Sequence, residues 1–444
     1  MDELSSLSRR EISAMQERYF AEMIELAAAR HPRTREQMAQ CNLSRADFRS
    51  LADLGRLPVT RKEDYMRAPD ALRLETEGLP EEMRAVWDVM YTTGSTAGTP
   101  TPFISTTYDF FRILEANRNM LRLRGARSDD IIASLFPLTP RPHGAFIRTL
   151  HAAASLNLRV VAALPGNPSP YFTLGNDLDR VVQVLAQCRA SILWGVPSYV
   201  RRVVARAEEL GADFSAVRLA LVTGEGLPEP ARAELTAALR RIGTAEAWVS
   251  ISYGATEMQG GMVECAPGSG YHNPAPDQFF FEVVDPQSLA PLDDGKPGLV
   301  LLTHLRRRGT VLLRYALGDI STLSHDRCPY CGAWTDRLVA MPRRADRLMK
   351  VKGTLVNPDV LVQAVEGVLG AREFQFAVGS SVAGDVLTLK VAAGEDGMLA
   401  ATLAEAVKRA CGVTPMVEFV AADAISDPSR SWKARRIIDQ RRPM

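Results

Sequence analysis

The chain has 444 residues, of which 46% are hydrophobic and 24% are charged, and its formal net charge is +1. This composition is that of a globular protein, and the length predicts two domains or one large domain with an appendage. A net charge near zero gives no electrostatic reason to expect a nucleic acid or an anionic membrane as a partner.

Cysteine content and hydropathy exclude two further classes of protein. Six cysteines in a chain of this length do not form a disulfide framework. No apolar run approaches the roughly 18 residues that a membrane span needs, and the amino terminus lacks a signal-peptide pattern. We therefore expect a cytoplasmic protein whose thiols are free or metal-bound.

The first half of the chain predicts an α/β fold. Ser8 and Glu11 have the spacing of a capping box, which predicts a helix running to about Arg30. From Asp129 onward, amphipathic helical patterns alternate with short β-branched runs. The runs expected to form buried strands are DDIIASLF, LRVVAALP, ASILWGVP, RLALVTG and EAWVSISYG. This alternation predicts parallel strands covered by helices.

After Tyr253 the pattern changes. The stretches QFFFEVVDP, GLVLLTHL and TVLLRYALGD predict strands with few helices between them, which favours an antiparallel or barrel-like lobe. The last hundred residues predict a helix, two strands, a helix and a strand. We therefore expect a large amino-terminal domain, 1–343, with helix-covered sheets and a β-rich lobe, and a small α+β carboxy-terminal domain, 344–444. The basic cluster at 306–308 is expected in a solvated loop or at a strand edge.

Residues 92–99, TTGSTAGT, offer backbone N–H groups and hydroxyls with no bulky side chain in the way. Such a nest binds phosphate oxygens, because small residues let the main chain approach closely. The stretch lacks the Gly-Lys-Ser/Thr of a Walker A loop and is no dinucleotide fingerprint. Taken alone, a mobile glycine-rich surface loop explains it equally well.

Five later stretches resolve this ambiguity by their order along the chain. They are TGEGLP (223–228), YGATE (253–257), YALGD (315–319), RAD with KG (344–346 and 352–353), and SWKARR (431–436). Together with 92–99, they make the chain resemble the adenylate-forming superfamily, and within it the phenylacetate–CoA ligase family. The resemblance implies an enzyme that uses ATP and Mg²⁺ to convert a small aryl or arylacetic acid into an acyl-AMP and then transfers the acyl group to CoA.

The resemblance also implies roles for individual residues. The phosphate loop would use Thr92, Thr93, Gly94, Ser95, Thr96 and Gly98, the adenine-binding turn Gly224, Glu225 and Gly226, and the nucleotide motif Tyr253, Gly254 and Ala255. Thr256 would donate to the α-phosphate, Glu257 would hold Mg²⁺, and Asp319 would accept the ribose hydroxyls. Without the family, a turn-capping aspartate would be the preferred interpretation of Asp319.

Three further roles concern catalysis and domain movement. A cation placed between the carboxylate and the α-phosphate stabilises charge in the transition state, and the resemblance assigns this role to Lys433. Charge patterning alone would make Lys433 a solvated residue of a basic tail. Asp346 matches the hinge about which the small, mobile domain rotates to admit CoA. Arg344 would hold either the nucleotide or the hinge.

A metal site is predicted from ligand chemistry. Cys328 and Cys331 have C-x₂-C spacing, typical of half a tetrahedral zinc site, and Cys265 and His272 offer the other half. The phenylacetate–CoA ligase family carries a comparable cluster. Four protein ligands leave no open position, so the zinc would be structural. The alternatives are a redox pair or unpaired surface thiols, and His325 is a competing ligand. The remaining cysteines, Cys41, Cys188 and Cys411, are expected to be small core residues.

The acyl pocket is the least determined part of the prediction. By resemblance, His143 lies where the family places a residue beside the acyl group, and Phe146 and Trp194 are candidate walls. Each would otherwise be a structural histidine or a core aromatic. Ala316, Arg343, Arg347 and Trp432 depart from the family pattern.

Two other functions are left open. One is an adenylating enzyme that passes the acyl group to an amine or a carrier-protein thiol, and the other is a non-catalytic nucleotide-binding relative. The presence of Lys433 and Glu257 argues against the second. A homodimer is also left open.

Overall fold

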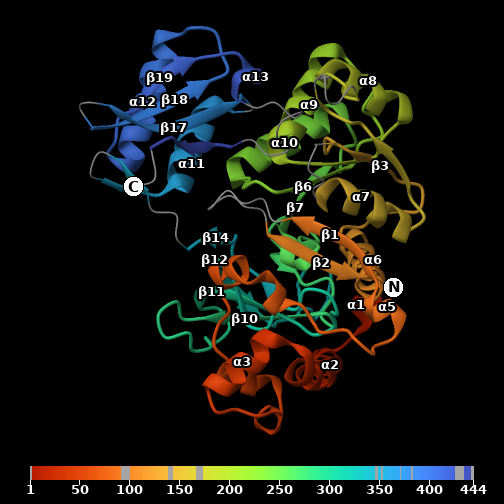
Figure 1. Cartoon of the computed structure of the whole chain (residues 1–444). Helices are drawn as coiled ribbons and strands as arrows, with labels where there is room; N and C mark the ends of the chain where they lie inside the picture. The colour runs from red at the N-terminus through yellow and green to blue at the C-terminus, as the bar shows by residue number, and fades with distance from the viewer. Residues whose placement is uncertain are drawn as a thin grey trace. The chain divides into compact units, whose positions relative to one another are not determined.

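The structure of the protein is a computed structural model (Figure 1). It describes residues 3–91, 101–138, 144–166, 174–345, 349–351, 354–370, 372–381, 384–425 and 435–441. The chain divides into two compact units. The first comprises Met1–Asp129, Pro142–Leu158 and Ser252–Ala345, and the second comprises Asp130–Arg141, Arg159–Ile251 and Asp346–Met444. Each unit is described by itself below.

The first unit begins with helices and short helical turns. These are α1 (Glu3–Ser6), α2 (Arg9–Arg30), α3 (Pro32–Gln40), η1 (Arg45–Asp47), η2 (Leu51–Arg56), α4 (Lys62–Arg67), η3 (Pro69–Leu72) and α5 (Glu81–Arg84). The capping box is confirmed: Ser8 Oγ accepts from the Glu11 backbone N–H, and the Glu11 carboxylate accepts from that of Ser8. The apolar face of α2 is buried in a cluster that includes Phe20, Met23 and Ile24.

Two sheets complete the first unit. The ribbon of β1 (Val86–Tyr91) and β2 (Pro102–Thr106) is antiparallel, and α6 (Thr107–Leu123) and α7 (Gly144–Ser155) follow. A larger sheet has the order β10 (Phe279–Val284), β11 (Pro297–His304), β12 (Tyr315–Ser324), β13 (Arg337–Leu338), β9 (Tyr271–His272) and β8 (Gly260–Val263), while β14 (Arg343–Arg344) pairs with β12. These pairings are antiparallel, which confirms the expected antiparallel lobe.

One strand of this sheet starts later than predicted. The expected strand at 310–319 begins only at Tyr315 and continues to Ser324. Arg314 interrupts it with a φ of 44°, a left-handed conformation that a strand cannot contain. Its guanidinium donates to the backbone carbonyls of Gly55 and Leu57, so distant parts of the chain determine its conformation.

The second unit contains the parallel strands that the alternating pattern predicts. β3 (Ile131–Ser134) lies between β4 (Arg159–Ala162) and β5 (Ile192–Gly195), and β5 also pairs with β6 (Leu219–Thr223), always in parallel. β7 (Trp248–Ala255) is the next strand in the order and continues past Ile251 into the first unit. The helices between these strands are α8 (Leu178–Cys188), α9 (Pro197–Leu210) and α10 (Glu229–Ile242).

The carboxy-terminal part of the second unit has its own core. Its elements are β15 (Met349–Val351), β16 (Thr354–Val356), α11 (Pro358–Leu369), β17 (Phe374–Ser381), β18 (Gly384–Val391), α12 (Gly397–Cys411), β19 (Met416–Phe419), α13 (Ala422–Ile425) and β20 (Ile437–Asp439). The strands follow the order β19-β18-β17-β20. Helices α11 and α12 lie beside these strands (Figure 1), and Leu361 and Leu403 are buried in the shared core. The expected helix, strand pair, helix and strand are confirmed, whereas β15, β16, α13 and β20 were not predicted.

Two expectations about polar and sulfur-containing side chains are wrong. Arg307, expected in a solvated position, is buried, stacks over the Phe103 ring at 4.3 Å and donates to the carbonyls of Ile104 and Thr310. Cys41, expected in the core, is exposed, while Cys188 and Cys411 are half-buried. Charge patterning misplaced Arg307 because buried carbonyls can satisfy a guanidinium as well as water does.

The α/β fold class is confirmed, and the division at 343/344 stays a prediction. Within the residues that the structure describes, no helix combines the length and the apolar character required to cross a membrane.

Candidate functional site

The predicted site residues fall into three groups. Outside the described residues lie Thr92, Thr93, Gly94, Ser95, Thr96, Gly98, His143, Asp346 and Lys433. In the first unit lie Phe146, Tyr253, Gly254, Ala255, Thr256, Glu257, Asp319, Arg344 and the four predicted metal ligands. In the second unit lie Trp194, Gly224, Glu225 and Gly226. The geometry below therefore concerns mainly the first unit.

Tyr253, Asp319 and Arg344 are brought together by three strands. The Tyr253 hydroxyl on β7 donates to Asp319 Oδ2 on β12 over 2.6 Å. Arg344, directly opposite Asp319 in the β12–β14 pairing, places its Nε 3.4 Å from Asp319 Oδ1. Its Nη1 also donates to the Leu317 carbonyl over 2.8 Å. The ribose-binding candidate is thus a carboxylate held between a phenol and a guanidinium.

Burial and the charge of Asp319 both keep the Tyr253 phenol protonated. They raise the pKa of Tyr253 well above its usual value, so the hydroxyl remains a donor. Gly318 supports this arrangement: its φ is 80°, and a Cβ there would lie 3.0 Å from Arg344 Nη1. A glycine at this position therefore gives the Arg344 side chain room beside the strand.

Glu257 lies in the short turn η4 (Thr256–Met258) and is held by two residues. The Tyr315 hydroxyl donates to Glu257 Oε1 over 3.1 Å, and His304 Nε2 donates to the Glu257 backbone carbonyl over 2.9 Å. Burial, followed by the charge of Glu257, raises the pKa of Tyr315, so the phenol stays neutral. A half-buried carboxylate beside a neutral hydrogen-bond donor offers oxygen ligands of the kind that a hard cation such as Mg²⁺ prefers.

The contact from His304 was not foreseen in the sequence. Its ring is buried at the end of β11, and its Nδ1 accepts from the Leu312 backbone N–H over 3.1 Å. Both ring nitrogens therefore have partners, which requires the neutral tautomer with the proton on Nε2. Only the strand register brings His304 to Glu257, so no local signal could have revealed it.

Four candidates lie in the second unit. Gly224 has a φ of 89°, as a tight turn after β6 requires, and Glu225 Oε2 accepts from the Ser198 backbone N–H over 3.3 Å. Trp194 is buried on β5, whereas Phe146 lies half-buried on α7 in the first unit. The acyl pocket therefore stays a prediction.

The four predicted metal ligands lie together. The ligand atoms of Cys265, His272, Cys328 and Cys331 are within 4.8 Å of one another. Cys265 and Cys328 have their sulfurs 3.7 Å apart, and Cys331 Sγ is 3.6 Å from His272 Nε2. With zinc–sulfur bonds of about 2.3 Å and tetrahedral angles, two thiolates lie roughly 3.8 Å apart, and a thiolate and an imidazole nitrogen roughly 3.6 Å apart. The donor set and its spacing therefore fit tetrahedral zinc.

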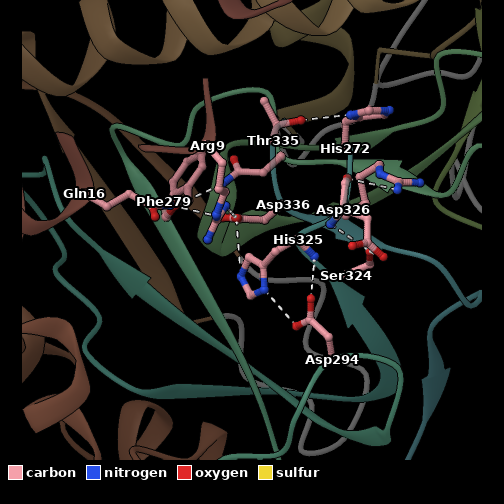
Figure 2. Close-up of polar contacts among 12 residues, drawn as sticks. Arg9, Gln16, His272, Phe279, Asp294, Ser324, His325, Asp326, Thr335 and Asp336 are labelled. Atoms are coloured by element: carbon pink, nitrogen blue, oxygen red, sulfur yellow. Dashed lines mark hydrogen bonds and ion pairs between the residues drawn. The ribbon is translucent and has the colours of Figure 1, made fainter. Parts of the chain in front are cut away.

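Local structure orients these ligands. His272 Nδ1 is 2.8 Å from the Thr335 hydroxyl, which leaves Nε2 for the thiol side of the ring (Figure 2). The Cys328 carbonyl accepts from the Gly332 N–H, and Gly332 adopts a φ of 75° to close the turn. His325, the competing ligand, instead places its ring nitrogens against Asp294 and Asp336, at 2.7 and 3.5 Å.

Comparison with known proteins agrees with this geometry. Residues 80–304, just over half of the 444-residue chain, match the family model described as AMP-binding enzyme. The chain belongs to the AMP-binding enzyme family.

Relatives and solved structures extend the similarity to nearly the whole chain. Over 99% of its length, the chain is 25% identical to the phenylacetate-coenzyme A ligase of Thermus thermophilus and 23% identical to that of Escherichia coli K12, covering 99% and 98% of them. Its fold is similar to that of a 2-hydroxyisobutyryl-CoA ligase in the postadenylation state in complex with R3-HIB-AMP. The TM-score is 0.77 at 21% identity, covering 98% of this chain and 91% of that one.

Proposed function

We propose that this protein is an AMP-forming ligase that activates a small aryl or arylacetic acid with ATP and passes the acyl group to CoA. The observation that carries the proposal is the double connection between the motifs 253–257 and 315–319. Tyr253 of the first motif donates to Asp319 of the second, and Tyr315 of the second donates to Glu257 of the first. Two relatives named phenylacetate-coenzyme A ligase, similar over nearly their whole length, support the choice of acid and acceptor.

In the first step, a carboxylate oxygen of the acid attacks the α-phosphorus of ATP. A new P–O bond forms, the bond between the α- and β-phosphates breaks, and pyrophosphate leaves. Asp319 accepts from the ribose hydroxyls, and Thr256 donates to the α-phosphate. Glu257 would hold Mg²⁺, which, when bound, offsets the charge of the phosphates. Lys433 stabilises the charge that develops between the carboxylate and the phosphorus.

Other predicted residues complete the nucleotide site in this proposal. Residues 92–99 supply donors for the β- and γ-phosphates, and Gly224, Glu225 and Gly226 border the adenine. Arg344, already 3.4 Å from the Asp319 carboxylate, keeps that carboxylate oriented toward the ribose.

In the second step, the CoA thiol attacks the acyl carbonyl carbon. A C–S bond forms, the C–O bond to AMP breaks, AMP leaves, and the thiol proton passes to water. This step requires the domain 344–444 to turn about Asp346, because the thiol must reach the carbonyl that the first step leaves buried.

The cysteine–histidine cluster has a structural role in this proposal. Cys265, His272, Cys328 and Cys331 would hold one zinc ion with four protein ligands, so no coordination position remains for a substrate. The ion would join the loop after β8 to β9 and to the turn at 328–331.

Mass spectrometry of reaction mixtures tests the function. The protein is incubated with ATP, Mg²⁺ and a panel of aryl and arylacetic acids, with and without CoA. We expect an acyl-CoA mass that requires both ATP and CoA, together with AMP. An acyl-AMP without any thioester would contradict CoA as the acceptor, and the absence of both products with every acid would contradict an aryl-acid ligase.

A further inference from the structure

Arg148 occupies a buried position close to the predicted magnesium turn. It lies on α7, and its side chain is only 7% exposed. Its Nη2 donates to Asp88 Oδ2 over 2.6 Å and to Gln259 Oε1 over 2.5 Å. Its Nη1 is 3.1 Å from His151 Nδ1. A buried guanidinium is tolerated only when it is paired, and here one carboxylate and two neutral acceptors surround it.

Gln259 connects Arg148 to the turn that carries Thr256 and Glu257. It directly follows η4, and both its backbone N–H and its side-chain amide donate to the Thr256 carbonyl, over 3.1 and 2.6 Å. Because the amide nitrogen faces Thr256, the amide oxygen faces Arg148. Gln259 is therefore held at both ends, and this fixes its orientation.

The backbone of Gln259 is held in an unfavourable conformation. Its φ is 51°, in the left-handed region that residues with a side chain rarely adopt. Such a conformation persists only where the surroundings determine it, and such residues cluster at functional sites. At Gln259 the surroundings are the carbonyl of Thr256 and the guanidinium of Arg148.

Asp88 gives the network a second connection to the predicted site. It lies on β1, whose last residue, Tyr91, directly precedes the predicted phosphate segment 92–99. The ion pair between Asp88 and Arg148 therefore joins the strand that leads into that segment to the turn that carries Glu257. His151, whose pKa is lowered by burial and then by the nearby charge of Arg148, accepts from Arg148 in its neutral form.

We propose that Arg148 is a positioning residue for adenylation, which acts through Gln259 to hold the Thr256–Glu257 turn against Mg²⁺ and the α-phosphate. This inference rests on the proposed function, because that function gives Thr256 and Glu257 their roles. Arg148 itself contacts neither side chain in the contacts described above. Its effect should therefore be transmitted entirely by Gln259.

The test is a double-mutant cycle with Arg148→Met and Gln259→Gly. Methionine keeps the length of the side chain without the donors, and glycine accepts the left-handed φ without the amide. ATP–pyrophosphate exchange with a substrate acid measures the first step. We expect each variant to lose about 10–100-fold in kcat and to need more Mg²⁺ for half-saturation, as is typical for partners that orient a metal ligand. The kcat of the double variant should be no lower than that of Gln259→Gly alone, and its Mg²⁺ requirement should be no higher.

Two further variants separate positioning from general stability. Arg148→Lys keeps a cation beside Asp88 and should recover part of the exchange rate. Arg218→Met breaks another largely buried arginine–aspartate pair, with Asp130, and should leave the Mg²⁺ requirement unchanged. Three outcomes would each overturn the proposal. The first is a rate of ATP–pyrophosphate exchange in Arg148→Met within twofold of wild type, and the second is a double variant in which the two losses of kcat multiply. The third is a rise in the Mg²⁺ requirement of Arg218→Met equal to that of Arg148→Met.

A measurement independent of catalysis completes the test. Hydrogen exchange of a peptide covering 253–263 should be faster in Arg148→Met than in wild type, because the Gln259 N–H bond to Thr256 loses its support. Unchanged hydrogen exchange in Arg148→Met would overturn the role of Arg148 even if wild type proved inactive with every acid. Inactivity of wild type itself would count against the proposed function and not against Arg148.

Discussion

The Tyr315 hydroxyl donates to Glu257 Oε1 over 3.1 Å and thereby connects strand β12 to the turn η4, 58 residues earlier in the chain. The Tyr315 ring is itself fixed, because it meets the Tyr65 ring edge-on with centroids 6.3 Å apart. A rigid neutral donor orients the carboxylate without cancelling its charge. Glu257 can therefore approach a cation from one defined direction.

The first prediction concerns this contact. In Tyr315→Phe, the Mg²⁺ concentration for half-maximal ATP–pyrophosphate exchange should rise about tenfold, because a hydrogen bond that orients a metal ligand is lost. Tyr330→Phe is the matched control, since the Tyr330 side chain is exposed and lies outside the motif. An unchanged Mg²⁺ requirement in Tyr315→Phe would mean that this bond does not orient a magnesium ligand.

The second prediction concerns the metal centre. Protein purified without chelators should contain about one zinc ion per chain, and Cys265→Ser should contain almost none, because a tetrahedral site with three ligands binds zinc far more weakly. The control is Cys41→Ser, which changes an exposed thiol outside the cluster. Elemental analysis of the three proteins gives the answer, and a zinc-free wild type would rule out the site.

The third prediction concerns Asp336, which joins helix α2 to the region of the predicted metal centre. Its buried carboxylate accepts from Arg9 Nη1 over 2.5 Å and from Gln16 Nε2 over 3.1 Å (Figure 2). Asp336→Asn should lower the free energy of unfolding by about 2–3 kcal/mol, because it leaves buried donors without a charged acceptor.

Asp294→Asn provides the control for this measurement. Asp294 also pairs with His325, but its side chain is 42% exposed, so the change should cost less than about 0.5 kcal/mol. Urea unfolding of both variants tests the prediction. Equal losses of unfolding free energy in the two variants would contradict a larger contribution from the buried Asp336 carboxylate.

The fourth prediction concerns pH and His31, which is buried and caps α3 by accepting from the Thr34 N–H. Burial lowers the pKa of His31 from 6.5 to about 4. Between these values, the unfolded chain binds a proton that the folded protein does not. The contribution of His31 to stability is therefore fully present above pH 6.5 and is lost as the pH falls through the folded pKa.

His31→Asn keeps a capping acceptor without a titrating group. From pH 7 to 4.5, wild type should lose on the order of 2 kcal/mol more unfolding free energy than this variant does. Urea unfolding of the two proteins at both pH values measures the difference, because the acidic groups titrate in both. If wild type and His31→Asn lost the same unfolding free energy between the two pH values, the lowered pKa of His31 would be contradicted.

Local signals predicted the parts of the fold that depend on local chemistry. The capping box at Ser8 marked the start of α2, and β-branched runs marked β3 to β7. The late start of β12 could not be predicted, because carbonyls of residues 55 and 57 set the conformation of Arg314. Similarly, ligand chemistry and resemblance together indicated which cysteines and which histidine would meet.

The supporting residues of the site were not predictable in the same way. His304 and Gln259 reach the Glu257 turn through strand register and through a left-handed backbone conformation, respectively. A histidine or a glutamine in a sequence does not by itself indicate that it supports a turn in the site. The motifs identify the residues expected to touch substrate, whereas tertiary contacts alone identify those that hold them.

The contact between Arg9 and Asp336 also affects how the protein is made. Helix α2 leaves the ribosome early, but its buried partner is synthesised 327 residues later. The apolar face of α2 packs with Leu305, Val311 and Leu313, which also come late. At a rate of synthesis of roughly 5–20 residues per second, tens of seconds pass between the synthesis of α2 and that of these partners. During that time the apolar face of α2 is only partly covered, because Met38 and Phe48 of the same cluster are synthesised soon after the helix and the late residues are still missing. Shielding by chaperones should therefore matter for α2 until the late residues arrive.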